Sequence, residues 1–71
     1  MFDRITFDPK IMGGRACIRG MRIPVSVIVG QIAHGASPKE ILGGYPDLEE
    51  RDVQQAMEYA AWLTQEDVHI A

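Results

Sequence analysis

The stretch RACIRGMRIPV, residues 15–25, decides the fold because it predicts a β-hairpin that leads directly into a helix. A two-residue loop at Arg19-Gly20 pairs residues 16–18 with residues 21–23, although Arg-Gly is a weaker loop than Asn-Gly. Side chains alternate along paired strands, so this register separates an apolar face from a basic one. The apolar face holds Ala16, Ile18, Met21 and Ile23, and the outward face holds Arg15, Cys17 and Arg22, with Arg19 at the tip. We expect the apolar face to anchor the hairpin on the helices.

Three helices are expected after the hairpin, at about residues 25–34, 37–44 and 49–66. The second begins with a capping box of Ser37 and Glu40, and the third has Asp47 with Glu50 as its expected cap pair. A strand and hairpin occupy residues 4–23. The chain, residues 1–71, is therefore expected to be a single, mainly helical domain. Its helices form either a helix-turn-helix or a plain three-helix bundle.

A chain of 71 residues with one cysteine has few ways to reinforce its small core. Cys17 cannot form an internal disulfide, and together with His34 and His69 it does not supply the four ligands of a structural zinc site. Metal and cofactor sites are not expected, whereas a homodimer is. The sequence shows neither a signal peptide nor a long apolar run, which predicts a cytoplasmic protein without a membrane segment.

An enzymatic role is not expected either. Cys17 with His34 or His69 is the nucleophile–base pair that stands out, but a cysteine among apolar residues is more often inert packing. A chain of this size also leaves little room for an enclosed pocket. The expected set of catalytic residues is therefore empty.

The net charge of −3 hides an asymmetry along the chain. Residues 1–25 carry five basic and two acidic side chains, a balance of +3, whereas residues 26–71 carry two basic and eight acidic ones, a balance of −6. A basic head on an acidic body indicates either an anionic partner at the head or electrostatic pairing between subunits. Two ordinary solvated faces would explain the pattern equally well.

Two elements are candidates for contact with DNA. A basic hairpin fits the major groove as a two-stranded ribbon, and the third helix would occupy the groove in a helix-turn-helix. Acidic residues crowd the start of that helix and repel phosphate, so the hairpin is the better candidate, and a two-fold dimer would double its arginines. The candidate DNA-binding residues are Arg15, Arg19, Arg22, Arg51, Gln54 and Gln55.

Four apolar residues are candidates for a dimer or partner interface. Ile5 and Phe7 lie on a short strand whose edge needs a partner. Tyr59 and Trp62 widen the apolar stripe of the third helix, which then has two sides to bury. We expect one side of that helix to face the core and the other to face a partner.

The blocks ITFDPKIMGGRACIRGMRIPV, HGASPKEILGGYPDL and DVQQAMEYAAWL resemble the small prokaryotic family called domain of unknown function 433. The likeness spans about Ile5 to Leu63. Matching positions in the first block are Asp8, Pro9, Ile11, Gly14, Ile18, Gly20, Arg22, Ile23, Pro24 and Val25, and later ones are Tyr45, Pro46, Leu48, Asp52, Val53, Ala56, Tyr59 and Ala60. Ala16 stands where the family favours Pro, and Met21 where it favours Thr.

The resemblance implies a homeodomain-like or winged-helix-like three-helix fold with an N-terminal hairpin. It also implies an antitoxin of a VapBC-like pair, whose toxin is a PIN-like ribonuclease. We therefore expect a dimeric antitoxin-like protein that binds and neutralises such a toxin and regulates its own operator by binding DNA. The alternative is a protein-interaction module that touches no DNA, which the acidic start of the third helix favours.

Overall fold

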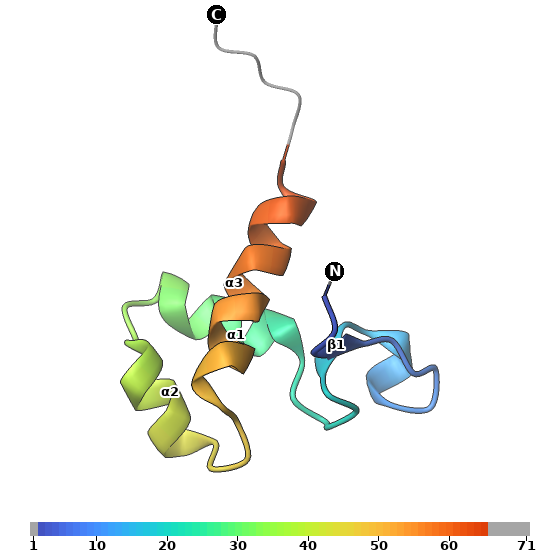
Figure 1. Cartoon of the computed structure of the whole chain (residues 1–71), viewed down its shortest axis with the longest axis horizontal. Helices are drawn as coiled ribbons and strands as arrows, with labels where there is room; N and C mark the ends of the chain where they lie inside the picture. Colours follow the sequence, from blue (N-terminus) through green and yellow to red (C-terminus); the bar gives the residue numbers. More distant parts are fainter. Residues whose placement is uncertain (1, 66–71) are drawn as a thin grey trace, which may run out of the picture.

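The computed structural model describes residues 2–65, and its elements follow the predicted order (Figure 1). Two short strands, β1 (Ile5–Thr6) and β2 (Cys17–Ile18), flank one turn of 3-10 helix, η1 (Met12–Gly14). Three helices follow: α1 (Val25–Ala33), α2 (Pro38–Gly44) and α3 (Glu50–Leu63). Within these residues the domain is mainly helical, with three helices and an N-terminal two-stranded hairpin, which confirms the predicted fold class. Residue 66, the predicted end of the third helix, lies outside the described residues.

The predicted pairing of residues 16–18 with residues 21–23 is wrong. β2 pairs with β1 in an antiparallel register, with Ile5 opposite Ile18 and Thr6 opposite Cys17. On its other edge, β2 pairs with a segment two residues later than the predicted one. Cys17 of β2 forms an isolated bridge with Pro24 there. β2 therefore lies between two neighbouring segments, and Cys17, predicted on the outward face, is only 1% exposed.

The tight turn at Arg19-Gly20 is present, although the strand does not continue after it. The Met21 N–H donates to the Ile18 carbonyl oxygen at 2.8 Å. Arg19 (φ +45°) and Gly20 (φ +71°) both adopt the left-handed conformation, as in a type I′ turn. The Ile18 N–H then bonds to the Ile23 carbonyl oxygen at 3.0 Å, which shifts the register by two residues relative to the alternating pattern.

Predicted caps hold the connection between α1 and α2. The Ser37 hydroxyl oxygen accepts the Glu40 backbone N–H at 3.2 Å, and the Glu40 carboxylate accepts the Ser37 N–H at 3.0 Å. This capping box starts α2 and lowers the pKa of Glu40 through its bond to the Ser37 backbone. Gly35, with φ +99°, ends α1 in a conformation that glycine adopts without strain.

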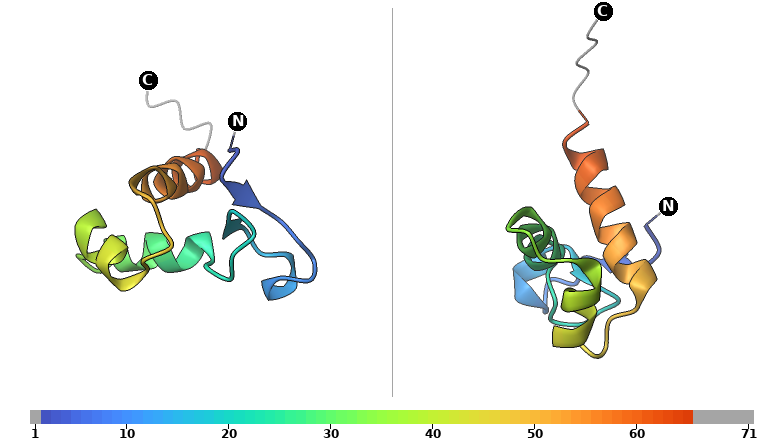
Figure 2. Two further views of the ribbon diagram at one scale, coloured as in Figure 1. Left: turned by 60° about the horizontal axis from the view of Figure 1, so that its bottom comes forward. Right: turned by 90° about the vertical axis from the view of Figure 1, so that its left-hand side faces the viewer.

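The core lies where the three helices meet the hairpin. Helix α3 lies across α1, and every pair of helices is in contact (Figure 2). The buried core residues are Ile5, Ile18, Val25, Ile28, Ile41, Leu48, Val53 and Ala56. The buried residues of α3 all belong to its first half, whereas its last turns extend beyond the other helices (Figure 1).

Among residues 2–65, no helix is both long enough and apolar enough to cross a membrane.

Candidate functional site

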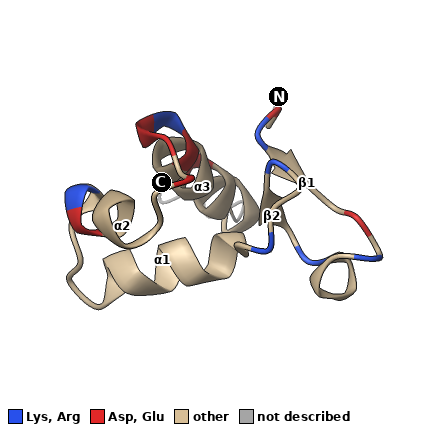
Figure 3. Ribbon diagram, turned by 90° about the horizontal axis from the view of Figure 1, so that it is seen from below, with Lys and Arg blue, Asp and Glu red and all other residues tan. Residues whose placement is uncertain are grey.

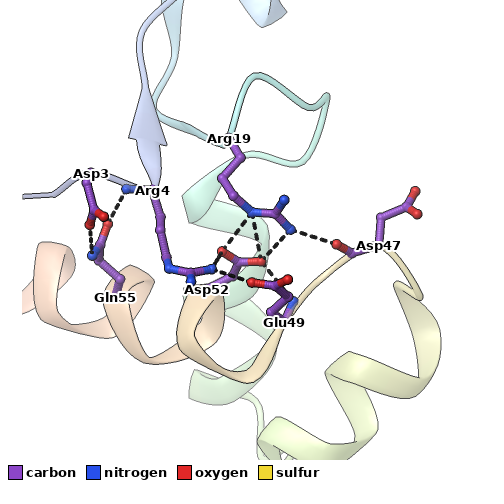
Figure 4. Close-up of polar contacts among 7 residues, drawn as sticks. All are labelled: Asp3, Arg4, Arg19, Asp47, Glu49, Asp52 and Gln55. Carbon is purple, nitrogen blue, oxygen red and sulfur yellow. Dashed lines mark hydrogen bonds and ion pairs between the residues drawn. The ribbon is translucent and has the colours of Figure 1, made fainter.

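Asp52, in the first turn of α3, is the centre of an ion-pair network (Figure 4). Its side chain is 0% exposed and accepts hydrogen bonds from two arginines. Arg4 Nη1 donates to Oδ1 at 2.8 Å, and Arg19 Nη2 donates to Oδ2 at 2.8 Å. Arg19 Nε lies 3.1 and 3.2 Å from the two oxygens, and Arg4 Nη1 also pairs with Glu49 at 2.7 Å. The network therefore joins the segment before β1, the turn after β2 and the start of α3.

Asp52 also caps α3, which corrects the predicted cap. Glu49, rather than Asp47, is the N-cap residue, and its backbone N–H donates to Asp52 Oδ2 at 2.8 Å. Asp52 takes the place predicted for Glu50 because it is the third residue of the helix, where a carboxylate reaches back to the cap and lies near the positive end of the helix dipole.

Burial alone would raise the pKa of Asp52. The hydrogen bonds from Arg19, the Glu49 N–H and Arg4 outweigh that effect and lower the pKa of this carboxyl from 3.8 to about 2. The bond to Glu49 is the largest cause of the raised pKa of Arg4, and the bond to Asp52 is the largest cause for Arg19. Asp52 is therefore ionised at neutral pH, with the unfavourable burial of its charge offset by two cations and the helix cap.

Gln55 provides a second link between α3 and the N-terminal segment. Its Oε1 accepts the Arg4 backbone N–H at 2.7 Å, and its Nε2 donates to Asp3 Oδ1 at 2.9 Å (Figure 4). The bond from Gln55 is the main cause of the lowered pKa of Asp3. The N-terminal segment is thus held on α3 by both its backbone and its side chains.

Two of the predicted DNA-binding residues, Arg19 and Gln55, are hydrogen-bonded to other parts of the protein. Gln55 is 9% exposed and uses both ends of its amide, and Arg19 Nη2 also donates to the Asp47 carbonyl oxygen at 2.8 Å. In the sequence, Asp52 is one of several acidic residues at the start of the third helix. The signal for its real position is its spacing, because Asp52 shares one side of the helix with Val53 and Ala56.

The other predicted DNA-binding residues lie at the surface: Arg15, Arg22, Arg51 and Gln54 are exposed. No ion pair holds any of these arginines among residues 2–65. Basic residues gather in the strand and loop region, and acidic residues at the start of α3 (Figure 3). Contact of the exposed residues with DNA stays a prediction.

An aromatic cluster joins the N-terminal segment to the second half of α3. Tyr59 packs against Phe2 at a ring-centroid distance of 5.2 Å, against Trp62 at 6.0 Å and against Phe7 at 6.1 Å. Phe7 and Trp62 remain 57% and 49% exposed, so both are available to a partner. Ile5, also predicted at the interface, is instead a core residue because it faces Ile18 across the strand pair.

Two open grooves flank the crossing of α1 and α3. The carboxyl-terminal groove, of about 490 Å³, is lined by Arg15, Ala16, Val25, Ser26, Val29, Tyr59, Ala60, Leu63 and Thr64. The acidic groove, of about 510 Å³, is lined by Ile32, Pro38, Glu50, Val53, Gln54, Met57, Glu58 and Ala61. They differ in charge, because Arg15 is the only ionisable side chain with a formal charge in the first, while Glu50 and Glu58 contribute to the second.

The side chains weighed for metal binding or catalysis do not come together in the described part of the chain. No group of three or more His, Cys, Asp or Glu residues there is arranged to hold a metal ion. Cys17 is buried near the start of α1, and His34 Nδ1 lies 2.7 Å from the Gly30 carbonyl oxygen at its other end. His69 lies outside the described residues. The absence of enzymatic activity stays a prediction.

Comparison with known proteins places this geometry in a family. The family model described as protein of unknown function (DUF433) matches residues 5–60. Uncharacterized protein y4eO of Sinorhizobium fredii (strain NBRC 101917 / NGR234) is 34% identical over 56 residues, which cover 79% of this chain and 25% of that protein. A crystal structure of a DUF433 member from Anabaena variabilis ATCC 29413 matches with a TM-score of 0.80 and 38% identity, covering 84% of this chain and 59% of that one. This chain therefore spans about a quarter of the curated relative.

Proposed function

Because the chain belongs to the DUF433 family, we propose that it acts as an antitoxin-like protein that binds and neutralises a PIN-like ribonuclease. The resemblance suggests the partner, and the acidic groove supplies a physical reason. The half-buried side chains of Ile32 and Met57 give this groove an apolar interior, and Glu50 and Glu58 are exposed beside them. This combination is the observation that carries the proposal.

Electrostatics favour a ribonuclease as the occupant of the acidic groove. A ribonuclease binds a polyanion, so its RNA-binding surface carries cations. A protein that covers such a surface benefits from facing carboxylates and from apolar contacts that exclude water. Glu50 and Glu58 take part in no ion pair among residues 2–65, whereas Glu49 and Asp52 are paired with the internal arginines.

The test first establishes whether the adjacent reading frame encodes a PIN-like ribonuclease, and then measures the affinity of the full chain for that protein by isothermal titration calorimetry. Glu58→Lys reverses a charge in the acidic groove and is expected to raise Kd about tenfold or more, because like charges then face each other. Asp47→Lys is the matched control, since it makes the same change at an exposed residue that does not line the groove. We expect it to raise Kd less than about threefold.

Two results would contradict this proposal. The unaltered chain could fail to bind the ribonuclease, which would remove the partner. Alternatively, Glu58→Lys and Asp47→Lys could weaken binding equally, which would show that net charge rather than the acidic groove determines affinity. Circular dichroism of both variants checks that α3 is intact.

Operator binding is a second candidate function, favoured by the exposed and unpaired Arg15 and Arg22 of the described chain. We expect Arg15→Ala with Arg22→Ala to weaken binding to the upstream promoter and to reduce the slope of log K against log salt by about 2 for each bound chain, one phosphate for each arginine. Lys10→Ala, which removes another exposed cation of the same segment, is the control. An unchanged mobility shift at matched salt would leave a protein-interaction module that touches no DNA.

A further inference from the structure

The second half of α3 lacks the cover that its first half has. Among the described residues of α3, burial ends at Ala56, and residues 61–65 are all exposed. Residues 59–65, YAAWLTQ, nevertheless contain no charged side chain, and Leu63 and Trp62 are 59% and 49% exposed. The solvent-facing side of a helix usually carries charged or polar residues. An exposed, apolar and uncharged helix end is instead typical of a contact surface.

On this surface a ridge, formed by the exposed side chain of Leu63, lies beside the carboxyl-terminal groove. Leu63 forms part of one wall of the carboxyl-terminal groove, and Val25 and Val29 of α1 form part of the other. Trp62, on the same turn of α3, packs against the aromatic cluster, with ring-centroid distances of 5.7 Å to Phe2 and 6.0 Å to Tyr59. We propose that a second copy of this chain docks here, with Leu63 of each copy entering the carboxyl-terminal groove of the other around a two-fold axis.

Two features favour a second copy over another occupant. A two-fold interface requires one surface to carry both the projecting side chain and the groove that receives it, and here both lie on the same turn of α3. In addition, neither residues 59–65 nor the lining of the carboxyl-terminal groove contains an acidic side chain, so two chains of net charge −3 can meet there without carboxylates of the interface facing each other.

The small core gives a further reason for self-association. Eight buried apolar residues form the core of the described chain, and its single cysteine leaves it without an internal disulfide. The proposed interface does not involve the acidic groove, which lies on the other side of the α1–α3 crossing. The dimer proposal can therefore fail without affecting the toxin-binding proposal, and the reverse also holds.

The test is sedimentation equilibrium of the full chain from about 1 µM to about 1 mM, a range that captures dimers of micromolar affinity. Leu63→Glu places a carboxylate on the proposed ridge, and Ser26→Glu places one on the α1 wall of the groove. Both positions are exposed, and an acidic residue in the first turn of α1 is favourable to the helix, so both variants should fold. We expect each to raise the dimer Kd about tenfold or more, because removing the new carboxylate from water costs more than pairing with Arg15, which lines the same groove, returns.

Ala61→Glu is the matched control, since it adds the same charge to the same turn of α3 on the side of the acidic groove. It is expected to change the dimer Kd less than about threefold. A chain that remains monomeric throughout the range overturns the proposal and leaves the groove to another occupant, such as residues 66–71 of the same chain. A dimer that survives both Leu63→Glu and Ser26→Glu, or one that Ala61→Glu dissociates as strongly, also overturns it.

Discussion

Arg4 and Arg19 both bond to the buried Asp52, whereas Arg15 and Arg22 remain exposed without an ion pair in the described chain. All four arginines belong to the basic head of the sequence and contribute equally to its formal charge. Only the second pair is free of ion pairs in the described chain. The number of charged residues along a sequence therefore does not tell how many of those charges remain unpaired at the surface, because this depends on the fold.

Ion pairing with α3 also lowers the net charge of the basic head, residues 1–25, that is left for a partner. Once Arg4 and Arg19 are paired with α3, three cations of residues 1–25 remain against two acidic residues, a balance of +1 instead of +3. A surface of this kind is a weak electrostatic attractor for DNA in a monomer. Operator binding therefore depends on a dimer, which presents Arg22 twice, whereas Arg15 lines the groove of the proposed dimer interface.

The largest expected effect comes from removing the shared carboxylate with Asp52→Asn. The amide keeps the size of the side chain and can still accept the Glu49 N–H, but Arg19 loses its carboxylate partner and Arg4 keeps only Glu49 among the described residues. We expect a loss of about 3–5 kcal/mol in the free energy of unfolding, as for other broken buried ion pairs. Chemical denaturation followed by circular dichroism measures this loss. A change below about 1 kcal/mol would mean that the network does not hold the hairpin on α3.

Acid should weaken the same network in the unaltered chain. The pKa of Asp52 is about 2 in the folded protein and about 3.9 in an unfolded chain, so its contribution is complete above about pH 5 and is lost as the pH falls toward 2. The difference corresponds to about 2 kcal/mol, and Asp3 and Glu40, whose pKa values are also lowered, act in the same direction. Denaturation at several pH values measures it. A free energy of unfolding that stays constant from pH 5 to pH 2 would contradict the ion pairs.

The smallest expected change in stability comes from comparing an arginine that is paired with Asp52 with an arginine that is exposed and unpaired. Arg19→Lys keeps the charge but loses the planar set of donors that reaches both Asp52 oxygens and the Asp47 carbonyl, and we expect a loss of about 1–2 kcal/mol. Arg22→Lys, at an exposed residue, should change stability by less than about 0.5 kcal/mol. Thermal unfolding of the two variants side by side provides the comparison. Equal losses of stability in the two variants would contradict the distinction between arginines paired with Asp52 and exposed, unpaired ones.

Local patterns predict the helices of this protein well. The Ser37–Glu40 box marks a helix start through interactions between near neighbours, and the structure has it where the sequence predicts it. The strand register is not predictable in the same way. The alternation rule assumes one buried and one solvated face, whereas Cys17 and Ile18, on opposite faces of β2, are 1% and 0% exposed.

The candidate site follows the same division. Exposure of Phe7 and Trp62 is consistent with the apolar pattern of the sequence, but the bonds that engage Arg19 and Gln55 depend on contacts across 33 and 51 residues of chain. Neither contact has a local sequence signal. The two grooves likewise arise from the angle at which α3 crosses α1, which no single segment determines.

The most direct test of the account is neutralisation itself. The product of the adjacent reading frame, expected to be a PIN-like ribonuclease, is incubated with a fluorescent RNA, and cleavage is followed as the full chain is added. We expect cleavage to stop near one equivalent of the chain, and Glu58→Lys to require a clear excess while Asp47→Lys does not. Unchanged cleavage at about 100 µM of the unaltered chain, a concentration far above a micromolar Kd, would contradict the proposal.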